Sequence, residues 1–115
     1  MDWSATFLDC FRSADLRLVA YVPDTVLVPL IDGVRGDARF TVCAATREEE
    51  AIGIAAGAAL GGMRGAVLMQ SSGLGNSVNA LASLVVPYQL PVVLVISERG
   101  TLGEFNPVQV PIARA

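Results

Sequence analysis

Two runs of apolar residues, AVLM at positions 66–69 and VVLVI at positions 92–96, most restrict what this chain can fold into. Neither run alternates with polar residues, which is typical of strands that are buried on both faces of a parallel sheet. Segments with helical spacing stand between the strand-like runs. The alternation of strand and helix predicts an α/β fold with a parallel sheet and helices on both of its faces.

The expected elements follow one another closely along the chain. Helices are predicted over residues 3–14, 24–34, 46–62 and 74–85, and strands over residues 16–22, 39–45, 65–70 and 91–97. The first helix should place Phe7, Cys10 and Phe11 on one face, and Pro29 weakens the prediction of the second. The pattern stops after Ser97. A parallel sheet normally continues beyond such a loop, so residues 1–115 are expected to be a single domain that is truncated at its C-terminus.

Composition excludes several classes of function. Hydrophobic residues are 53% of the chain and charged residues 17%, so we expect a surface that a partner covers. The net charge is -3 with no basic cluster, which disfavours nucleic acid as a partner. The absence of histidine removes Ser/His and Cys/His catalysis. Cys10 and Cys43 fit no metal-ligand spacing, so no metal site is expected, and they are interpreted as reduced thiols of a cytoplasmic protein without a membrane span.

The segment TREEEAIGIAAGAALGG at positions 46–62 places three glutamates before an apolar helix. Thr46 and Glu49 have the spacing of a capping box, and the helix dipole favours negative charge at this end. These structural roles could account for all three glutamates. However, the rest of the helix has no polar face, so it should be buried or interfacial throughout. A glutamate in such a dry setting could share a proton with a ligand.

The segment MQSSGLGNSVNAL at positions 69–81 is predicted to be a strand, a glycine turn and the start of a helix. It lacks both G-x-G-x-x-G and Gly-Lys-Ser/Thr, so a conventional nucleotide site is disfavoured. A tight structural turn is one interpretation. The other is a ligand site, because α/β sheets bind ligands at the carboxyl ends of their strands, where Gln70, Ser71, Ser72 and Asn76 should gather.

The segment YVPDTVL at positions 21–27 ends another predicted strand at the same edge of the sheet. Asp24 or Thr25 could simply cap the helix that follows. Alternatively, these two side chains face a common crevice with Glu48 and residues 70–76, because all of them follow the carboxyl ends of parallel strands.

Four segments carry a resemblance to a known family: VPDTVLVPLI, TREEEAIGIAAGAALGG, AVLMQSSGLGNSVNALASL and GEFNPVQVP. Together they resemble the pyrimidine-binding domain of thiamine-diphosphate-dependent decarboxylases. Within that family they are most similar to the alpha subunits of sulfopyruvate decarboxylases, with phosphonopyruvate decarboxylases next. The resemblance covers most of the chain from about Tyr21 onward, in the family's order and spacing.

The resemblance implies a role for one glutamate. In this family a glutamate at the start of the helix hydrogen-bonds N1′ of the cofactor's aminopyrimidine ring and so activates the cofactor. Counting back nine residues from Gly57 gives Glu48 as the activating residue, and Glu49 is the alternative if the register slips by one. Other residues are carried over as the lining of the cofactor site (Asp24, Thr25, Ser72, Gly73, Asn76) or of the substrate site (Gln70, Ser71, Ser72, Asn76).

The resemblance also implies partners and a reaction. The family holds the diphosphate and Mg²⁺ on a second domain with a Gly-Asp-Gly motif, which this chain lacks. We therefore expect a beta-type partner subunit, with self-association as well. The implied reaction converts sulfopyruvate to sulfoacetaldehyde and carbon dioxide, with phosphonopyruvate as the alternative substrate and Arg99 or the partner supplying positive charge. A catalytically silent assembly domain is the other class of function that the chain could have, and a nucleotide-binding module is disfavoured.

Overall fold

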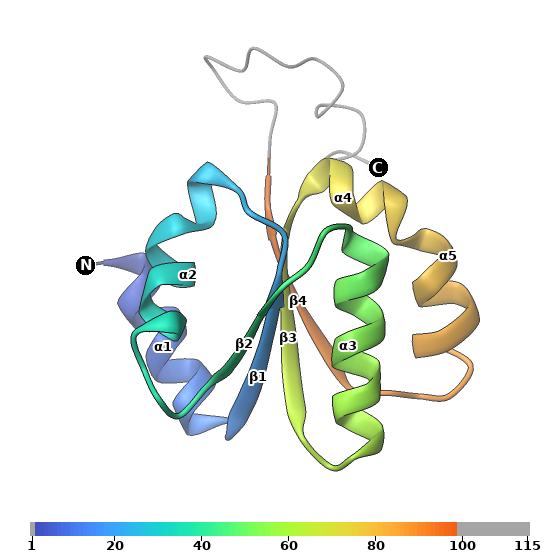
Figure 1. Cartoon of the computed structure of the whole chain (residues 1–115), viewed down its shortest axis with the longest axis horizontal. Coiled ribbons are helices and arrows are strands. Elements are labelled where there is room, and N and C mark those ends of the chain that lie inside the picture. Colours follow the sequence, from blue (N-terminus) through green and yellow to red (C-terminus); the bar gives the residue numbers. More distant parts are fainter. Residues whose placement is uncertain (1, 99–115) are drawn as a thin grey trace.

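A four-stranded parallel sheet separates the helices of this chain into two layers (Figure 1). The structure is a computed structural model that describes residues 2–98. The strands are β1 (Leu16–Tyr21), β2 (Thr41–Ala44), β3 (Arg64–Gln70) and β4 (Val92–Ser97), and their order across the sheet is β2-β1-β3-β4. All three pairings are parallel, as between Val67 of β3 and Leu94 of β4. All four carboxyl ends therefore lie at one edge of the sheet.

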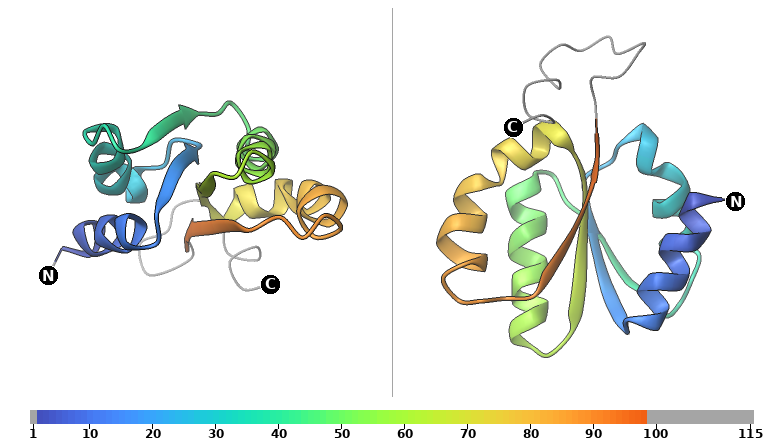
Figure 2. Two further views of the ribbon diagram at one scale, coloured as in Figure 1. Left: turned by 90° about the horizontal axis from the view of Figure 1, so that it is seen from below. Right: turned by 180° about the vertical axis from the view of Figure 1, so that it is seen from behind.

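Helices cover both faces of this sheet, as predicted (Figures 1 and 2). One layer holds α1 (Trp3–Ser13), the 3-10 turn η1 (Thr25–Leu27) and α2 (Val28–Arg35). The other holds α3 (Glu48–Leu60), then α4 (Ser71–Asn76), α5 (Val78–Ala80) and the π-helical turn η2 (Leu81–Val85). The α/β prediction is confirmed, and Pro29 is accommodated in the first turn of α2, where a missing backbone N–H costs no hydrogen bond.

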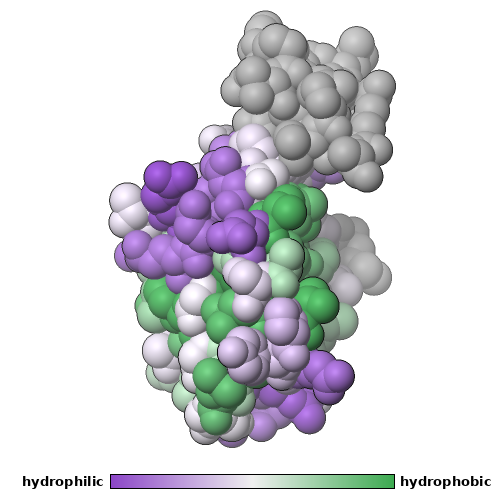
Figure 3. Space-filling model, turned by 90° about the vertical axis from the view of Figure 1, so that its right-hand side faces the viewer, coloured by the Kyte–Doolittle hydropathy of each residue, from purple (hydrophilic) through white to green (hydrophobic). Residues whose placement is uncertain are grey.

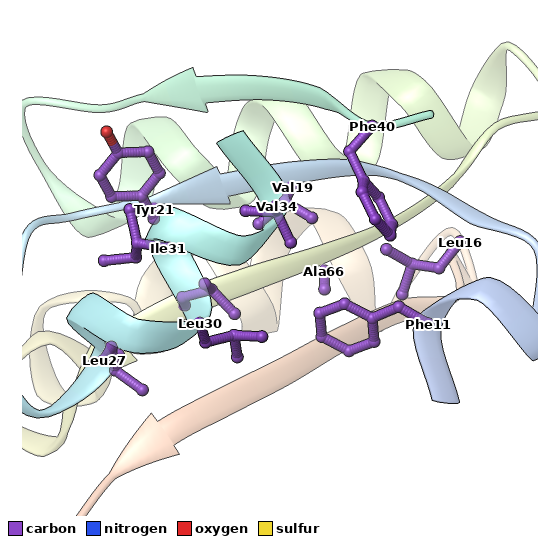
Figure 4. Packing of buried hydrophobic residues seen from close by; sticks show 11 residues of the cluster. Phe11, Leu16, Val19, Tyr21, Leu27, Leu30, Ile31, Val34, Phe40 and Ala66 are labelled. Carbon is purple, nitrogen blue, oxygen red and sulfur yellow. The ribbon is translucent and has the colours of Figure 1, made fainter. Parts of the chain in front are cut away.

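The core of the first layer is aromatic and aliphatic (Figure 4). Phe11 of α1 and Phe40 meet edge to face, with their ring centroids 6.4 Å apart. Side chains of α2 fill the space over β1, and Leu30 and Val34 are fully buried. Burying side chains of this size contributes roughly 1.5–3 kcal/mol each to the stability of the fold.

The core of the second layer depends on small residues in α3. Ala51, Ile52 and Ala55 pack on β1 and β3 and are fully buried. Their short side chains bring the helix close to the sheet, so that a Cβ at Gly65 would lie 3.6 Å from the Cβ of Ala55. The opposite side of α3 carries Gly53 and Gly57, both exposed. The helix is thus buried on one side in this chain, and whether a partner covers the other side, as the prediction of a helix that is buried or interfacial throughout requires, stays a prediction.

Two predicted helix starts were wrong. The capping box of Thr46 and Glu49 does not form: Arg47 is the N-cap residue of α3, in an extended conformation and without a side-chain capping bond. The expected glycine turn after β3 is also absent, because the chain passes from Gln70 directly into α4. Gly73 therefore lies inside a helix, where glycine has no conformational advantage.

The prediction for the first helix is confirmed in its geometry. Phe7, Cys10 and Phe11 share one face of α1 and line an apolar groove of about 530 Å³ against residues Val93 to Ile96 of β4. Of these three residues Phe11 is buried, whereas Phe7 and Cys10 are exposed. Within residues 2–98, no helix has the length and apolar character needed to cross a membrane. The segment GEFNPVQVP, Arg99 and the expected C-terminal truncation lie outside the described residues.

Candidate functional site

The carboxyl edge of the sheet gathers the polar residues that the sequence analysis singled out. Glu48 opens α3 after β2, Asp24 follows β1, Ser71 opens α4 after β3, and Ser97 ends β4. Buried polar side chains are few in the described residues, and most of them lie in this region: Asp24, Glu48, Ser71, Ser77 and Ser97. The edge is thus the polar end of an otherwise apolar interior.

Glu48 is buried at the point where α3 meets α4. Only 8% of the residue is exposed, and among residues 2–98 its carboxylate takes part in no ion pair. The carboxylate lies against the backbone of Gly73: a Cβ on Gly73 would come within 2.7 Å of Glu48 Oε1. Figure 1 shows the first turn of α3 beside α4 at this edge. Glu48 therefore presents a carboxylate at the junction of two helices, with no cation of the described chain to neutralise it.

The two neighbouring glutamates have different surroundings. Glu49 is half-buried and accepts a bond from Arg47 Nε at 3.2 Å. The pKa of Glu49 is lowered, first by a hydrogen bond from its own backbone N–H and then by Arg47. Glu50 is exposed. Negative charge in the first turn of a helix is favoured by the helix dipole, so Glu49 and Glu50 have structural explanations that do not extend to the burial of Glu48.

Asp24 bonds across the sheet edge instead of capping a helix. Its side chain makes no capping bond to η1, and it accepts a hydrogen bond from Ser97 Oγ at 2.9 Å. Both residues are buried, with 9% of Asp24 and 6% of Ser97 exposed. Because β3 lies between β1 and β4, this bond spans the carboxyl end of the central strand. A shallow depression of about 300 Å³ beside it is lined by Pro23, Asp24, Thr25 and Val28.

The residues predicted for the substrate site differ in how far they are buried. Ser71 is buried, Gln70 and Ser72 are half-buried, and Asn76 is exposed at the far end of α4. The helix that was predicted to start at Leu74 begins at Ser71 instead. The structure therefore moves the first turn of this helix to Ser71–Gly73, next to Glu48.

Two buried serines were missed by the sequence analysis. Ser77 Oγ donates to the carbonyl oxygen of Gly73 at 2.9 Å, which holds the peptide that the Glu48 carboxylate rests against. Ser97 donates to Asp24. The spacing of Gly73 and Ser77, four residues apart in a helix, is a local signal that could have indicated the first bond. The second depends on the strand order and has no local signal.

Comparison with known proteins identifies the family. Residues 1–104 match the model of the thiamine pyrophosphate enzyme, N-terminal TPP binding domain. The chain belongs to this family. Its α/β sheet with the polar carboxyl edge is thus the fold of a thiamine pyrophosphate binding domain.

Individual relatives of this TPP binding domain are decarboxylases or subunits of decarboxylases. It is 42% identical over 114 residues to the sulfopyruvate decarboxylase subunit alpha of Methanocaldococcus jannaschii, covering 99% of this chain and 68% of that protein. The subunit alpha of Methanothermobacter thermautotrophicus is 45% identical over 104 residues, which cover 90% of this chain and 63% of that protein. Phosphonopyruvate decarboxylase of Streptomyces viridochromogenes is 45% identical over 86 residues, 75% of this chain and 22% of that protein. The chain thus spans about two thirds of the alpha subunits that it matches.

Proposed function

We propose that this chain is the alpha-type subunit of a thiamine-diphosphate-dependent decarboxylase that converts sulfopyruvate to sulfoacetaldehyde and carbon dioxide. The proposal assigns to Glu48 the hydrogen bond that activates the cofactor's aminopyrimidine ring. It draws on membership of the TPP binding domain family and on identities of 42% and 45% to two sulfopyruvate decarboxylase alpha subunits.

The observation that carries the proposal is the burial of Glu48. Glu48 is a charged residue of which 8% is exposed, and its carboxylate makes no ion pair within residues 2–98. Burying a charged residue is costly unless the charge is paired or hydrogen-bonded, so a ligand or partner that supplies a hydrogen bond would stabilise it. A ring nitrogen of an aminopyrimidine is suited to that role, since it can share a proton with a carboxyl group. Glu49, the alternative by one residue, is bonded to Arg47 and to its own backbone N–H. The contrast between the two supports Glu48 as the activating residue.

Other residues of the carboxyl edge complete the proposed cofactor site. Asp24, Thr25, Ser72, Gly73 and Asn76 are proposed to line the cofactor site. Thiamine diphosphate, when bound, supplies the electron sink that accepts the electrons left by the departing carbon dioxide. The chain's own contribution is proposed to be a proton held at the Glu48 carboxylate, which lies against Gly73 where α3 meets α4.

A partner subunit is the second part of the proposal. The sequence has no Gly-Asp-Gly motif, so the partner is proposed to carry the diphosphate and Mg²⁺. The name subunit alpha of the matched relatives supports a partner chain. Exposed apolar residues also support a surface that a partner covers: Leu60 is 72% exposed and Val86 is 68% exposed. On the side of the molecule in Figure 3, hydrophobic residues reach the surface among hydrophilic ones.

The substrate assignment rests on donors for an anion. Gln70, Ser71 and Ser72 sit at the end of β3 with side chains that can donate hydrogen bonds. Sulfopyruvate carries a sulfonate, which needs several donors, and Asn76 is proposed as a further one. The full positive charge is assigned to Arg99 or to the partner subunit. Phosphonopyruvate, with a similar anionic end, is the alternative substrate.

A competition among substrates tests this function. The chain would be combined with the beta-type subunit of a sulfopyruvate decarboxylase, thiamine diphosphate and Mg²⁺, and assayed with sulfopyruvate, phosphonopyruvate and pyruvate. We expect sulfopyruvate to give a kcat/KM at least about tenfold above that of pyruvate, because a hydrogen bond to a charged group contributes roughly 1.5–3 kcal/mol. A higher value for pyruvate would contradict the anion assignment. No turnover of any substrate by a complex that does assemble would indicate a catalytically silent assembly domain.

A further inference from the structure

Gly73 stands where a glycine has no backbone reason to be. It lies inside α4, and among the described residues the glycine with positive φ is Gly62, not Gly73. Alanine stabilises a helix interior relative to glycine, so a glycine in this place loses stability unless the absence of a side chain serves another purpose.

The contact with Glu48 explains this glycine. A Cβ at Gly73 would come within 2.7 Å of both Cδ and Oε1 of Glu48, a distance that requires one of the groups to move. The backbone of Gly73 cannot easily retreat, because Ser77 Oγ holds its carbonyl oxygen at 2.9 Å and Ser77 is fully buried. The carboxylate of Glu48 would therefore be the group that moves.

We propose that Gly73 is a positioning residue for Glu48. Its backbone, which carries no side chain, contacts the carboxylate and determines where it lies, and the hydrogen bond from Ser77 holds this backbone in place. The proposal rests on the proposed function, because the position matters only if Glu48 acts on the cofactor. Any side chain at position 73 pushes the carboxylate off its place while leaving its chemistry intact. Displacement of a reacting group by about 1 Å can cost on the order of 10²-fold in rate.

A stability cycle in the full chain tests the contact without any cofactor. We expect Gly73→Ala to lower Tm when Glu48 is present, because the new methyl group meets the glutamate. In a chain that carries Glu48→Ala, which removes the atoms it would meet, the same change should raise Tm, since alanine favours the helix. If Gly73→Ala lowers Tm equally with and without Glu48→Ala, the proposal is overturned. Should Gly73→Ala alone fail to fold, the double variant must still fold.

Gly61→Ala is the matched control for this cycle. Gly61 follows α3 at the end far from the site, is exposed, and a Cβ there would lie at an ordinary 3.5 Å from Ala58 O. Its effect on Tm should be the same with and without Glu48→Ala. A dependence as large as that of Gly73→Ala would mean that Glu48 acts on stability globally, and it would overturn the proposal.

A second cycle measures turnover in the assembled enzyme. Gly73→Ala should lower kcat at least about tenfold in the wild-type background, and by much less in a background that already carries Glu48→Gln, because coupled residues are not additive. Equal losses in both backgrounds would assign Gly73 a role independent of Glu48. The stability cycle needs no substrate, so its sign reversal can stand even if the proposed decarboxylation fails.

Discussion

At the scale of single residues, Glu48 and Glu49 have the same side chain but opposite surroundings. Glu48→Gln in the assembled enzyme should leave the fold intact and lower kcat by at least about 100-fold, since general acid–base catalysis typically contributes 10²–10⁴-fold. Glu49→Gln is the control, because Glu49 is bonded to Arg47 and its own backbone, and its kcat should stay close to that of the wild type. Steady-state decarboxylation assays measure both, and the reverse order of effects would place the active register at Glu49.

The bond between Ser97 and Asp24 gives a second prediction at this scale. Ser97→Ala removes a buried donor at 2.9 Å from an Asp24 oxygen, and should lower the free energy of unfolding by about 1–3 kcal/mol, because the acceptor stays buried. Ser83→Ala is the control: Ser83 is an exposed serine whose hydroxyl bonds Asn79 O within its own helical segment, and should change stability by about 0.5 kcal/mol or less. Denaturant titration of the two variants compares them, and equal losses would mean that the bond to Asp24 adds little.

At the scale of elements, an ion pair joins α1 to the loop that follows α2. Arg12 Nη2 lies 3.0 Å from Asp37 Oδ2, and Asp37 Oδ1 accepts from the backbone N–H of Arg39 at 2.9 Å. The pKa of Asp37 is lowered from its ordinary 3.8, first by the Arg39 N–H and then by Arg12. A lowered folded pKa means that the contribution to stability is complete above the ordinary value and is lost as pH falls through the folded value.

The corresponding prediction is a pH-dependent effect of Asp37→Asn. The variant should have a lower Tm than the wild type at pH 7, and the difference should shrink as the pH falls below about 3.8. Asp32→Asn is the control, an exposed residue of α2 that makes no ion pair within residues 2–98, and its effect at pH 7 should be smaller. Thermal unfolding followed by circular dichroism at several pH values measures this. A difference in Tm that grows toward low pH would contradict the prediction.

The elements themselves were largely predictable from local patterns. The strands β1, β2 and β4 and the helices α1 and α3 lie within the residue ranges expected from hydrophobic spacing, and β3 and α2 extend one residue beyond theirs. The start of α3 was not predicted correctly. A capping box requires Thr46 to be the N-cap residue, whereas the N-cap residue is Arg47, in an extended conformation. The segment around Gly73 was predicted to be a turn, because glycine is common in turns. The contact with Glu48 that explains this glycine joins residues far apart in the sequence, so no local pattern indicates it.

At the scale of the whole molecule, the position of the candidate site was predictable and its internal bonds were not. Parallel strands bring their carboxyl ends to one edge, so Asp24, Glu48 and Ser71 were expected there from the element order alone. The bond of Ser97 to Asp24 depends on β3 lying between β1 and β4, and the strand order is decided by packing across the entire sheet. The roles of these residues toward cofactor and substrate stay predictions.

Surface composition at this scale supports an assembly of chains. In the described residues, large apolar side chains are exposed on both layers, including Trp3 on α1, Leu60 on α3 and Val93 on β4. Partners of a decarboxylase complex would cover part of this surface. The proposed role of Glu48, together with the lack of a Gly-Asp-Gly motif in residues 1–115, predicts that another chain is needed to hold the cofactor firmly.

The measurement that tests this account most directly is a titration with thiamine diphosphate in the presence of Mg²⁺, followed by calorimetry. It compares the isolated chain, the isolated beta-type subunit and their mixture. We expect weak binding to the isolated chain and markedly tighter binding to the mixture than to either chain alone, with Glu48→Gln reducing the gain. Tight, magnesium-dependent binding by the isolated chain would contradict the account, as would a mixture that binds no better than the beta-type subunit does by itself.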